Sequence, residues 1–213
     1  MTGRQIEAEL KFRAEDDRPL RTLAAAASLG PARLGPARVV DEVDRYLDTA
    51  DGRLAAARWA CRLRSREGRT FVSLKGPAEH EPGDALHRRP EVEGPAAAGL
   101  APNEWPPSPG RELLLALTAG EPLVERFTLE QERTEREVLL HGVRVGLLSL
   151  DRVRVIHRQA DLGRMLVVEL EIDPAALAAG LDHASLALPL REAGGLAPDP
   201  LSKFERALAM LAA

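Results

Sequence analysis

The segment Ile6-Glu7-Ala8-Glu9-Leu10-Lys11-Phe12 alternates apolar and charged residues along its whole length. Successive side chains of a β-strand point to opposite faces, so Glu7, Glu9 and Lys11 would share one face and the apolar residues the other. Two carboxylates about 4 Å apart repel by about 4 kcal/mol at an effective dielectric of about 20, so the arrangement needs a compensating cation. The segment therefore predicts a strand whose charged face binds a cation, and a divalent metal ion fits best.

The same alternation recurs along the chain. The further segments are Arg62-x-Arg64-x-Arg66 with Phe71 to Lys75 after a Glu67-Gly68 turn, Arg89-x-Glu91-x-Glu93, Leu147 to Asp151, and Glu169-x-Glu171-x-Asp173. In any one of them the charged face could simply be solvated. Charges sorted by sign within a strand, however, create a strong local field. The set favours a closed barrel with polar walls, whose acidic strands hold metal ions and whose basic strands hold a multiply charged anion such as a polyphosphate.

In their order along the chain, these segments resemble the signatures of the CYTH family, the triphosphate tunnel metalloenzymes. The motifs are Glu7-x-Glu9-x-Lys11, Tyr46-Leu47-Asp48-Thr49, Arg62-Leu63-Arg64, Leu74-Lys75-Gly76-Pro77, Arg89-x-Glu91-x-Glu93, Leu150-Asp151, Glu169-x-Glu171 and Ser202-Lys203-Phe204. The leading triplet alone is a weak signal, whereas the ordered set covers nearly the whole chain. The resemblance implies an α+β fold, in which an eight-stranded antiparallel closed β-barrel forms a tunnel open at both ends and carries flanking helices.

The resemblance also implies roles for individual residues. It implies a triphosphate substrate bound together with Mg²⁺ or Mn²⁺, with Glu7, Glu9 and Lys75 as the catalytic residues. The implied metal ligands are Glu7, Glu9, Glu91, Glu93, Asp151, Glu169 and Glu171. The implied phosphate-binding residues are Lys11, Arg62, Arg64, Lys75, Arg133 and Lys203. Two points stay open: which of Glu91 and Glu93 reaches the metal, and which arginine of the 126–136 stretch faces the tunnel.

Composition agrees with one soluble domain spanning residues 1–213. The net charge is only −4, from 29 basic and 33 acidic residues, so no global field favours nucleic acid or an anionic membrane. Aromatic residues make up 3% of the chain, too few for stacking platforms that bind single strands. The chain lacks an apolar run of about 18 residues, a second cysteine beside Cys61 and a secretory signal. We therefore expect a cytoplasmic protein whose partner is a small triphosphate.

The patterns between the charged strands predict further elements. A helix is expected from Asp16 or Asp17 to Gly30, and another from Ser108 to about Thr118. The second half predicts an extended run from Leu123 to Leu140, separate strands at 143–150 and 151–157, a hairpin turn at 161–164 and a helix opening at Pro174. The last helix is expected to start at Asp199-Pro200. Lys203 lies off its apolar stripe, which by itself indicates a solvated lysine, whereas the resemblance directs Lys203 at the phosphates.

The expected activity is metal-dependent hydrolysis of the terminal phosphate of inorganic triphosphate or a related triphosphate. Phosphoryl transfer is catalysed mainly by positioning and charge neutralisation, and a metal ion can acidify the attacking water. One alternative is an adenylyl cyclase or thiamine triphosphatase of the same family, for which the sequence shows no aromatic or amide cluster that would bind the organic group. Another is a non-catalytic polyphosphate-binding module, which would need only the basic strands.

Overall fold

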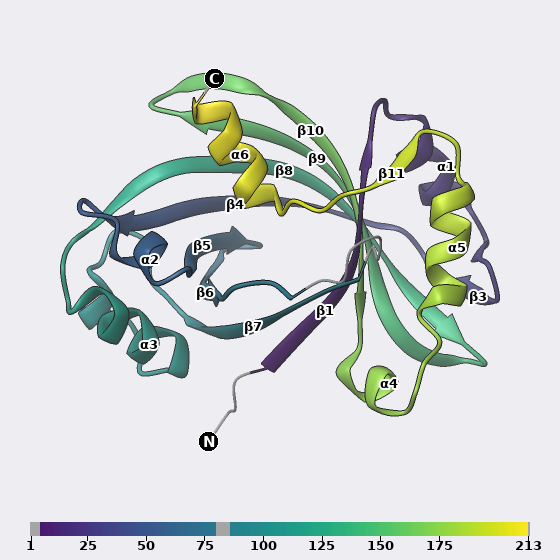
Figure 1. The fold of residues 1–213 in the computed structure, drawn as a ribbon, viewed down its shortest axis with the longest axis horizontal. Helices are drawn as coiled ribbons and strands as arrows, with labels where there is room; N and C mark the ends of the chain where they lie inside the picture. The colour runs from purple at the N-terminus through teal and green to yellow at the C-terminus, as the bar shows by residue number, and fades with distance from the viewer. Residues whose placement is uncertain (1–4, 80–85, 213) are drawn as a thin grey trace.

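Eight long antiparallel strands close into a barrel (Figure 1). The computed structural model describes residues 5–79 and 86–212. The barrel strands are β1 (Gln5–Ala14), β4 (Arg38–Thr49), β5 (Ala60–Arg66), β6 (Arg69–Lys75), β7 (Leu86–Pro95), β8 (Leu123–Leu140), β9 (Val143–His157) and β10 (Ala160–Ile172). Their order around the ring is β8-β4-β5-β6-β7-β1-β10-β9, and β9 pairs with β8 to close it. The predicted eight-stranded antiparallel barrel is confirmed.

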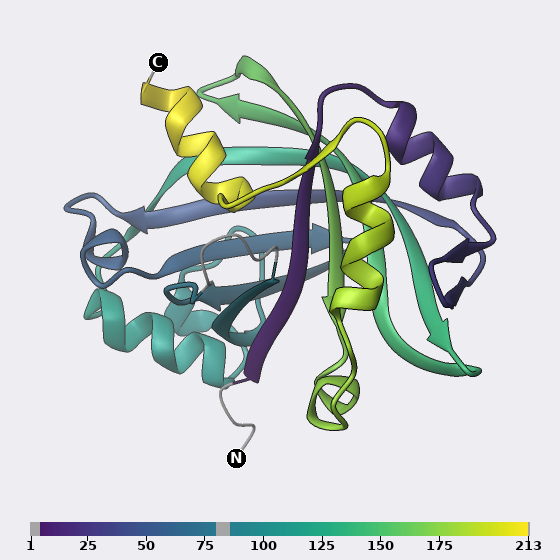
Figure 2. The ribbon, with the colours of Figure 1, turned by 45° about the vertical axis from the view of Figure 1, so that its right-hand side comes forward.

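Short strands and helices surround the barrel. The strands β2 (Ser28–Leu29) and β3 (Ala32–Leu34) extend the sheet from β8, and β11 (Leu196–Pro198) pairs with β1. The helices are α1 (Arg18–Ala25), α2 (Arg53–Ala56), α3 (Pro109–Thr118), α4 (Pro174–Ala178), α5 (Ala184–Glu192) and α6 (Lys203–Ala212), with a 3-10 turn η1 (Pro102–Glu104). Figure 2 shows α1 and α5 together on one side of the barrel and α2, α3 and α6 toward the other. Within the described ranges, no helix is both long and apolar enough to cross a membrane.

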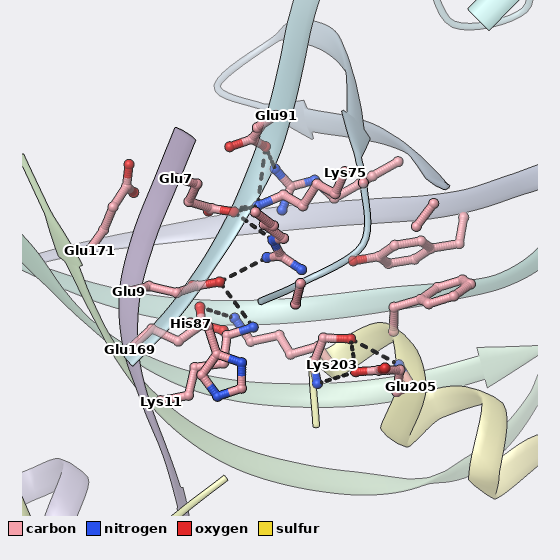
Figure 3. A pocket seen from close by; sticks show the side chains of 18 of the residues that line it. Glu7, Glu9, Lys11, Lys75, His87, Glu91, Glu169, Glu171, Lys203 and Glu205 are labelled. Atoms are coloured by element: carbon pink, nitrogen blue, oxygen red, sulfur yellow. Dashed lines mark hydrogen bonds and ion pairs between the residues drawn. The ribbon is translucent and has the colours of Figure 1, made fainter. Parts of the chain in front are cut away.

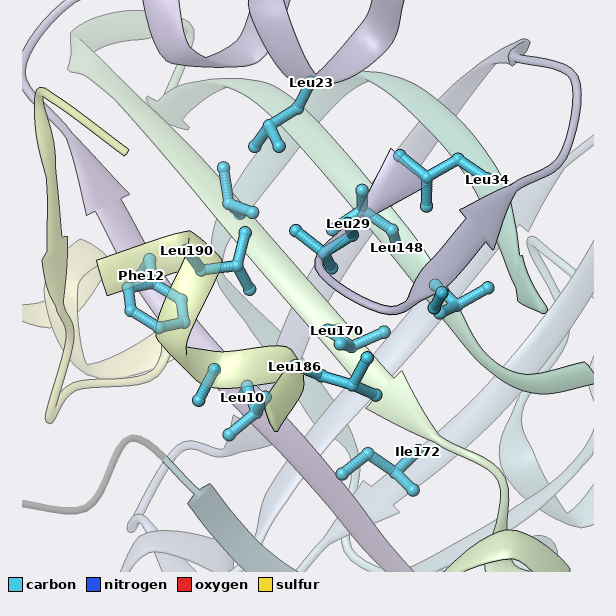
Figure 4. Packing of buried hydrophobic residues seen from close by; sticks show 14 of the residues in the cluster. Leu10, Phe12, Leu23, Leu29, Leu34, Leu148, Leu170, Ile172, Leu186 and Leu190 are labelled. Atoms are coloured by element: carbon cyan, nitrogen blue, oxygen red, sulfur yellow. The ribbon is translucent and has the colours of Figure 1, made fainter. Parts of the chain in front are cut away.

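From Glu7 to Phe12 both faces of β1 are buried, but only the outer face is apolar. Leu10 and Phe12 are fully buried on the outer face, where they pack with residues of β9, β10, α1 and α5 (Figure 4). Glu9 and Lys11 are 4% and 2% exposed and point into the barrel. The largest apolar core therefore lies outside the barrel, between its sheet and the surrounding helices.

The interior is not charged over its whole length. On β4, β8, β9 and β10, a second apolar cluster of inward residues packs against α6 and includes Tyr46, Phe127, Leu129, Val153, Val155, Met165 and Val167. Tyr46 stacks on Phe127 and contacts Phe204 of α6, with ring centroids 4.9 Å and 5.2 Å apart. Apolar side chains therefore fill part of the interior of the barrel, for which the resemblance implied a tunnel open at both ends.

Several predicted elements are confirmed. The basic hairpin of β5 and β6 turns at Glu67 and Gly68, and β8 has the predicted bounds. Helix α3 ends at Thr118 as predicted and begins beside Ser108, whose Oγ accepts a hydrogen bond from the Arg111 amide at 3.2 Å. Helix α4 begins at Pro174.

Other predicted boundaries are wrong. Helix α1 ends at Ala25, because the backbone becomes extended at Ala26 with ψ of 142°. Gly30 lies in the turn of the β2–β3 hairpin, with a positive φ of 54°. β9 is one continuous strand, and the next turn is formed by Arg158 and Gln159, both with positive φ. The 161–164 segment is instead a bulge within β10. Helix α5, strand β11 and the β2–β3 hairpin were not predicted.

The last helix begins at Lys203 and not at Asp199. The Asp199 amide donates to the Lys11 carbonyl at 3.0 Å, which continues the pairing of β11 with β1 past Pro198. Ser202 and Glu205 then cap the helix, since the Glu205 carboxylate accepts from the Ser202 amide at 2.7 Å and Ser202 Oγ accepts from the Glu205 amide at 3.2 Å. This cap fixes Lys203 in the first turn, where it enters the barrel.

Candidate active site

A cavity of about 640 Å³ occupies the barrel interior (Figure 3). Apart from Asp151, every residue predicted for the site lines it: Glu7, Glu9, Lys11, Arg62, Arg64, Lys75, Glu91, Glu93, Arg133, Glu169, Glu171 and Lys203. These residues come from β1, β5, β6, β7, β8, β10 and α6. The barrel and α6 thus bring together side chains that are up to about two hundred positions apart in the sequence.

Carboxylates gather on three adjacent strands, β7, β1 and β10, and we call Glu7, Glu9, Glu91, Glu169 and Glu171 the acidic wall. Glu9 lies directly opposite Glu171 in the β1–β10 pairing, and like charges at opposite positions destabilise a sheet. Burial, followed by the field of Glu7, raises the pKa of Glu171 from 4.5 to about 7. Among the described residues Glu171 has no hydrogen bond or ion pair. The acidic wall therefore contains a carboxylate that lacks a cation.

The two carboxylates that β1 contributes to the acidic wall, Glu7 and Glu9, are paired with cations. Lys75 Nζ contacts both oxygens of Glu7 at 2.7 Å and 2.8 Å. Arg89 bridges the pair, with Nε 2.7 Å from Glu7 and Nη2 2.9 Å from Glu9, and Lys11 Nζ lies 2.9 Å from Glu9. Burial alone would raise the pKa of Glu7, but Lys75 and Arg89 hold it well below its ordinary value. Glu7 is therefore ionised at neutral pH, as a metal ligand must be.

Glu91 and Glu93 occupy different depths. Glu91 is 14% exposed, lies 3.1 Å from Lys75 and accepts a hydrogen bond from Ser73. Glu93 is 58% exposed, and its nearest ion pair is to Arg62 at 3.9 Å. Partial desolvation and then the charge of Glu91 raise the pKa of Glu93. Glu91 is therefore the member of this pair that the fold places with the carboxylates of β1.

Asp151 lies behind the cavity wall. It is fully buried, and Arg133 contacts it through Nε at 2.7 Å and Nη2 at 2.8 Å. Lys203 Nζ lies 2.5 Å from Asp151 and 2.6 Å from Glu169. Burial opposes ionisation of Asp151, but Arg133 and then Lys203 keep its pKa below the ordinary value. In the structure Asp151 thus anchors two cations and does not face the cavity, while Lys203 is 9% exposed and is not a solvated lysine.

The arginine of the 126–136 stretch that enters the barrel is Arg133. Arg126 is exposed. Arg136 lies on the outer face, where it donates to the carbonyls of Gly35 at 2.7 Å and Leu23 at 3.0 Å. The register of β8, which one sequence could not fix, therefore agrees with the residue implied by the resemblance.

The sequence analysis assigned no role in the site to several interior residues, although Arg66 and Arg89 belonged to its charged strand patterns. Arg66 lines the cavity and forms a bidentate pair with Glu135 at 2.6 Å, and Arg89 lines it beside Glu7. Glu42 and Asp44 of β4 are each 1% exposed and contact the interior arginines. The spacing Glu42-x-Asp44 is the same period-two signal that identified β1, so the sequence carried the evidence. We call Arg62, Arg64, Arg66 and Arg133, on β5 and β8 at either side of β4, the arginine wall.

The acidic wall fits a divalent ion. Carboxylate oxygens are the ligands that Mg²⁺ and Mn²⁺ prefer, and the opposed Glu9 and Glu171 with the raised pKa of Glu171 indicate a missing positive charge. Within residues 5–79 and 86–212, no three His, Cys, Asp or Glu side chains are gathered tightly enough to hold an ion as they stand. Lys75, Lys11 and Arg89 contact these carboxylates instead.

An antiparallel barrel with carboxylates and arginines on opposite inner walls defines a tunnel-type fold with a charged interior. The sequence profile of the CYTH domain matches residues 5–207, and the chain belongs to the CYTH domain family. No curated protein sequence matches the chain significantly.

Solved structures with the same fold include a Hippeastrum protein described as a putative adenylyl cyclase with a dominant triphosphatase activity. It is 21% identical over 95% of each chain, with a TM-score of 0.66. A putative adenylate cyclase from Bacillus halodurans is 21% identical over 96% of this chain and 98% of its own, with a TM-score of 0.58. The PH1819 protein from Pyrococcus horikoshii is 16% identical over 95% and 98%, with a TM-score of 0.54.

Proposed function

We propose that the chain is a divalent-metal-dependent triphosphatase, which hydrolyses the terminal phosphate of inorganic triphosphate or a related triphosphate. The observation that carries the proposal is one cavity lined by the acidic wall and, across the ring, by the arginine wall. A triphosphate with its metal ion needs both sets of groups, whereas a simple anion needs only the cations. The family and the triphosphatase activity ascribed to the Hippeastrum protein support it.

The arginine wall would bind the phosphate chain. Arg62 has the most hydrogen-bonding capacity to offer, because its nearest contacts are Ser73 at 3.4 Å and Glu91 at 3.6 Å, and its buried Nε has no hydrogen-bond partner. Guanidinium groups bind phosphate oxygens in a fixed, bidentate geometry. Arg62 would therefore neutralise charge on the phosphate oxygens, and Arg64 and Arg133 would hold the chain in line.

The acidic wall would hold the metal, with Glu7, Glu9, Glu91, Glu169 and Glu171 offering carboxylate oxygens to Mg²⁺ or Mn²⁺. When bound, such an ion neutralises phosphate charge and lowers the pKa of a water ligand. Lys75 and Lys11 are paired with Glu7 and Glu9, so their ammonium groups become available to phosphate oxygens when those carboxylates bind a cation instead. Lys75 would then fix the terminal phosphate close to the acidic wall.

A triphosphate with an organic group is the second candidate. The aromatic side chains of Tyr46, Trp59 and Phe204 line the same cavity, although no aromatic cluster was predicted from the sequence. Flat rings of this kind could stack on a nucleoside or thiamine, so thiamine triphosphatase and adenylyl cyclase activities are tested together with the first. A module that only binds polyphosphate would need the arginine wall but not the carboxylates of the acidic wall.

The test is release of phosphate and of cyclic nucleotide from inorganic triphosphate, ATP and thiamine triphosphate, each with Mg²⁺, Mn²⁺ or EDTA. The proposal expects phosphate from inorganic triphosphate in the presence of metal and none with EDTA. Faster release from thiamine triphosphate or ATP would select the second candidate, and cyclic AMP would replace hydrolysis with cyclisation. Binding of every triphosphate without any product would identify a binding module.

A further inference from the structure

Two buried carboxylates stand behind the arginine wall. Glu42 and Asp44 occupy successive inward positions of β4, and each is 1% exposed. In the β4–β5 pairing Glu42 lies opposite Arg66 and Asp44 opposite Arg64, and on the other side Glu42 lies opposite Gln131 of β8. The two carboxylates are therefore enclosed between the two strands that carry the arginines, and they lie away from the acidic wall.

Asp44 holds one arginine in a fixed plane. Arg64 donates from Nε to Oδ1 and from Nη2 to Oδ2, both at 2.7 Å, and Gln131 Nε2 donates to Oδ2 at 2.8 Å. Burial opposes ionisation, but Arg64 and then Arg62 hold the pKa of Asp44 far below its ordinary value. A bidentate pair with an ionised carboxylate fixes both the position and the orientation of the guanidinium.

This arrangement leaves a defined part of Arg64 for a ligand. Its Nη2 also lies 3.1 Å from Glu42, whereas Nη1 makes no hydrogen bond to any described residue. The side chain is 15% exposed and lines the cavity. Because the guanidinium is planar, the bond to Asp44 determines where the free Nη1 donors point.

We propose that Asp44 is a positioning residue, which through Arg64 sets the geometry in which the tunnel holds a triphosphate. The proposal rests on the proposed function, since it needs a polyphosphate in this cavity. A positioning role and a simple countercharge role predict opposite effects of removing Asp44 on anion binding. Removing a negative charge beside the arginines would strengthen anion binding, whereas loss of the fixed geometry weakens it.

Three variants separate these effects. Asp44→Asn removes the charge and one of the two acceptor oxygens, and Asp44→Glu keeps the charge but displaces the carboxylate by one methylene. Gln131→Met removes one bond to Asp44 together with Gln131 Oε1, a buried oxygen that has no hydrogen-bond partner, so it should cost little stability. Asp41→Asn is the matched control, because Asp41 is exposed on the outer face of the same strand.

The experiment measures binding of inorganic triphosphate by calorimetry in Mg²⁺, together with kcat, KM and thermal unfolding for each variant. We expect Asp44→Asn and Asp44→Glu to weaken binding and raise KM by up to about tenfold, with a smaller change in kcat. Gln131→Met should show a smaller rise in KM, and Asp41→Asn none.

Two results would overturn the proposal while leaving the proposed function intact. One is tighter or unchanged binding by Asp44→Asn, and the other is wild-type KM in Asp44→Glu and Gln131→Met. If Asp44→Asn fails to fold, the other two variants still decide the question. If the wild-type protein neither binds nor hydrolyses inorganic triphosphate, the proposed function falls, and this inference falls with it.

Discussion

The two faces of β1 are both buried from Glu7 to Phe12 but differ in chemistry. On β1, Leu10 and Phe12 pack outward into the apolar core beneath α1 and α5, and Glu9 and Lys11 point inward among other charges. Most small barrels place their apolar side chains inside. Here the largest apolar core lies outside the barrel, so much of the interior is available for ionic groups.

This division separates stability from function. Each fully buried leucine or phenylalanine contributes about 1.5–3 kcal/mol by leaving water. A buried ion pair contributes little net stability, because the cost of removing both charges from water offsets their attraction. The outer core should therefore control folding, and the inner walls should control activity.

Substitution in the acidic wall should have the largest effect. Glu9→Gln keeps the size of the side chain but removes a charge needed to hold a cation, so metal-dependent turnover should fall by more than about a hundredfold. The variant should still fold, as judged by circular dichroism. Glu130→Gln, at the exposed partner of Arg154 on the outer face of β8, is the control. Wild-type turnover in Glu9→Gln would refute the assignment, and Glu7→Gln should behave in the same way.

Substitution in the outer core should have the opposite profile. Leu170 is fully buried opposite Leu10, and Leu170→Ala should lower the free energy of unfolding by about 2–5 kcal/mol through lost packing and a cavity. The KM for triphosphate should stay unchanged at temperatures where the variant is folded. Val143→Ala, at a side chain that is 65% exposed on β9, should change stability by less than about 0.5 kcal/mol. A changed KM with normal stability would show that the two faces are not separable.

Substitution in the arginine wall should affect binding more than chemistry. Arg64→Ala removes donors that face the cavity, so we expect KM to rise by about tenfold with a smaller fall in kcat. Arg45→Ala removes an arginine of the neighbouring strand that pairs with Glu125 at the surface, and it should leave both parameters unchanged. An unaltered KM in Arg64→Ala would exclude a phosphate contact by this residue.

The sequence predicted the charged strands better than their surroundings. Period-two patterns identified β1, the basic hairpin and β10, because alternation within a strand does not depend on how that strand pairs with its neighbours. The partners of Glu42 and Asp44 depend on how β4 aligns with β5 and β8, and that register is set by contacts distant in the sequence. Helix α5 was missed for a similar reason, since its buried residues Leu186 and Leu190 are defined by packing on the barrel.

The smallest expected effect comes from the unpaired carboxylate of the acidic wall. Because the pKa of Glu171 is raised to about 7, the folded protein binds its proton more tightly than the unfolded chain does, and wild-type stability should decline as pH rises from about 4.5 to about 7. Glu171→Gln should therefore unfold at a higher temperature than wild type at pH 8 in EDTA, and at nearly the same temperature at pH 4.5. Since Glu171 is exposed, screening should limit the gain in stability of Glu171→Gln to about 1 kcal/mol.

Mg²⁺ should stabilise the wild type and reverse the order of the two unfolding temperatures at pH 8, because glutamine is a poor ligand. A pH-independent difference between the two proteins would show that the acidic wall is already compensated and does not need a cation.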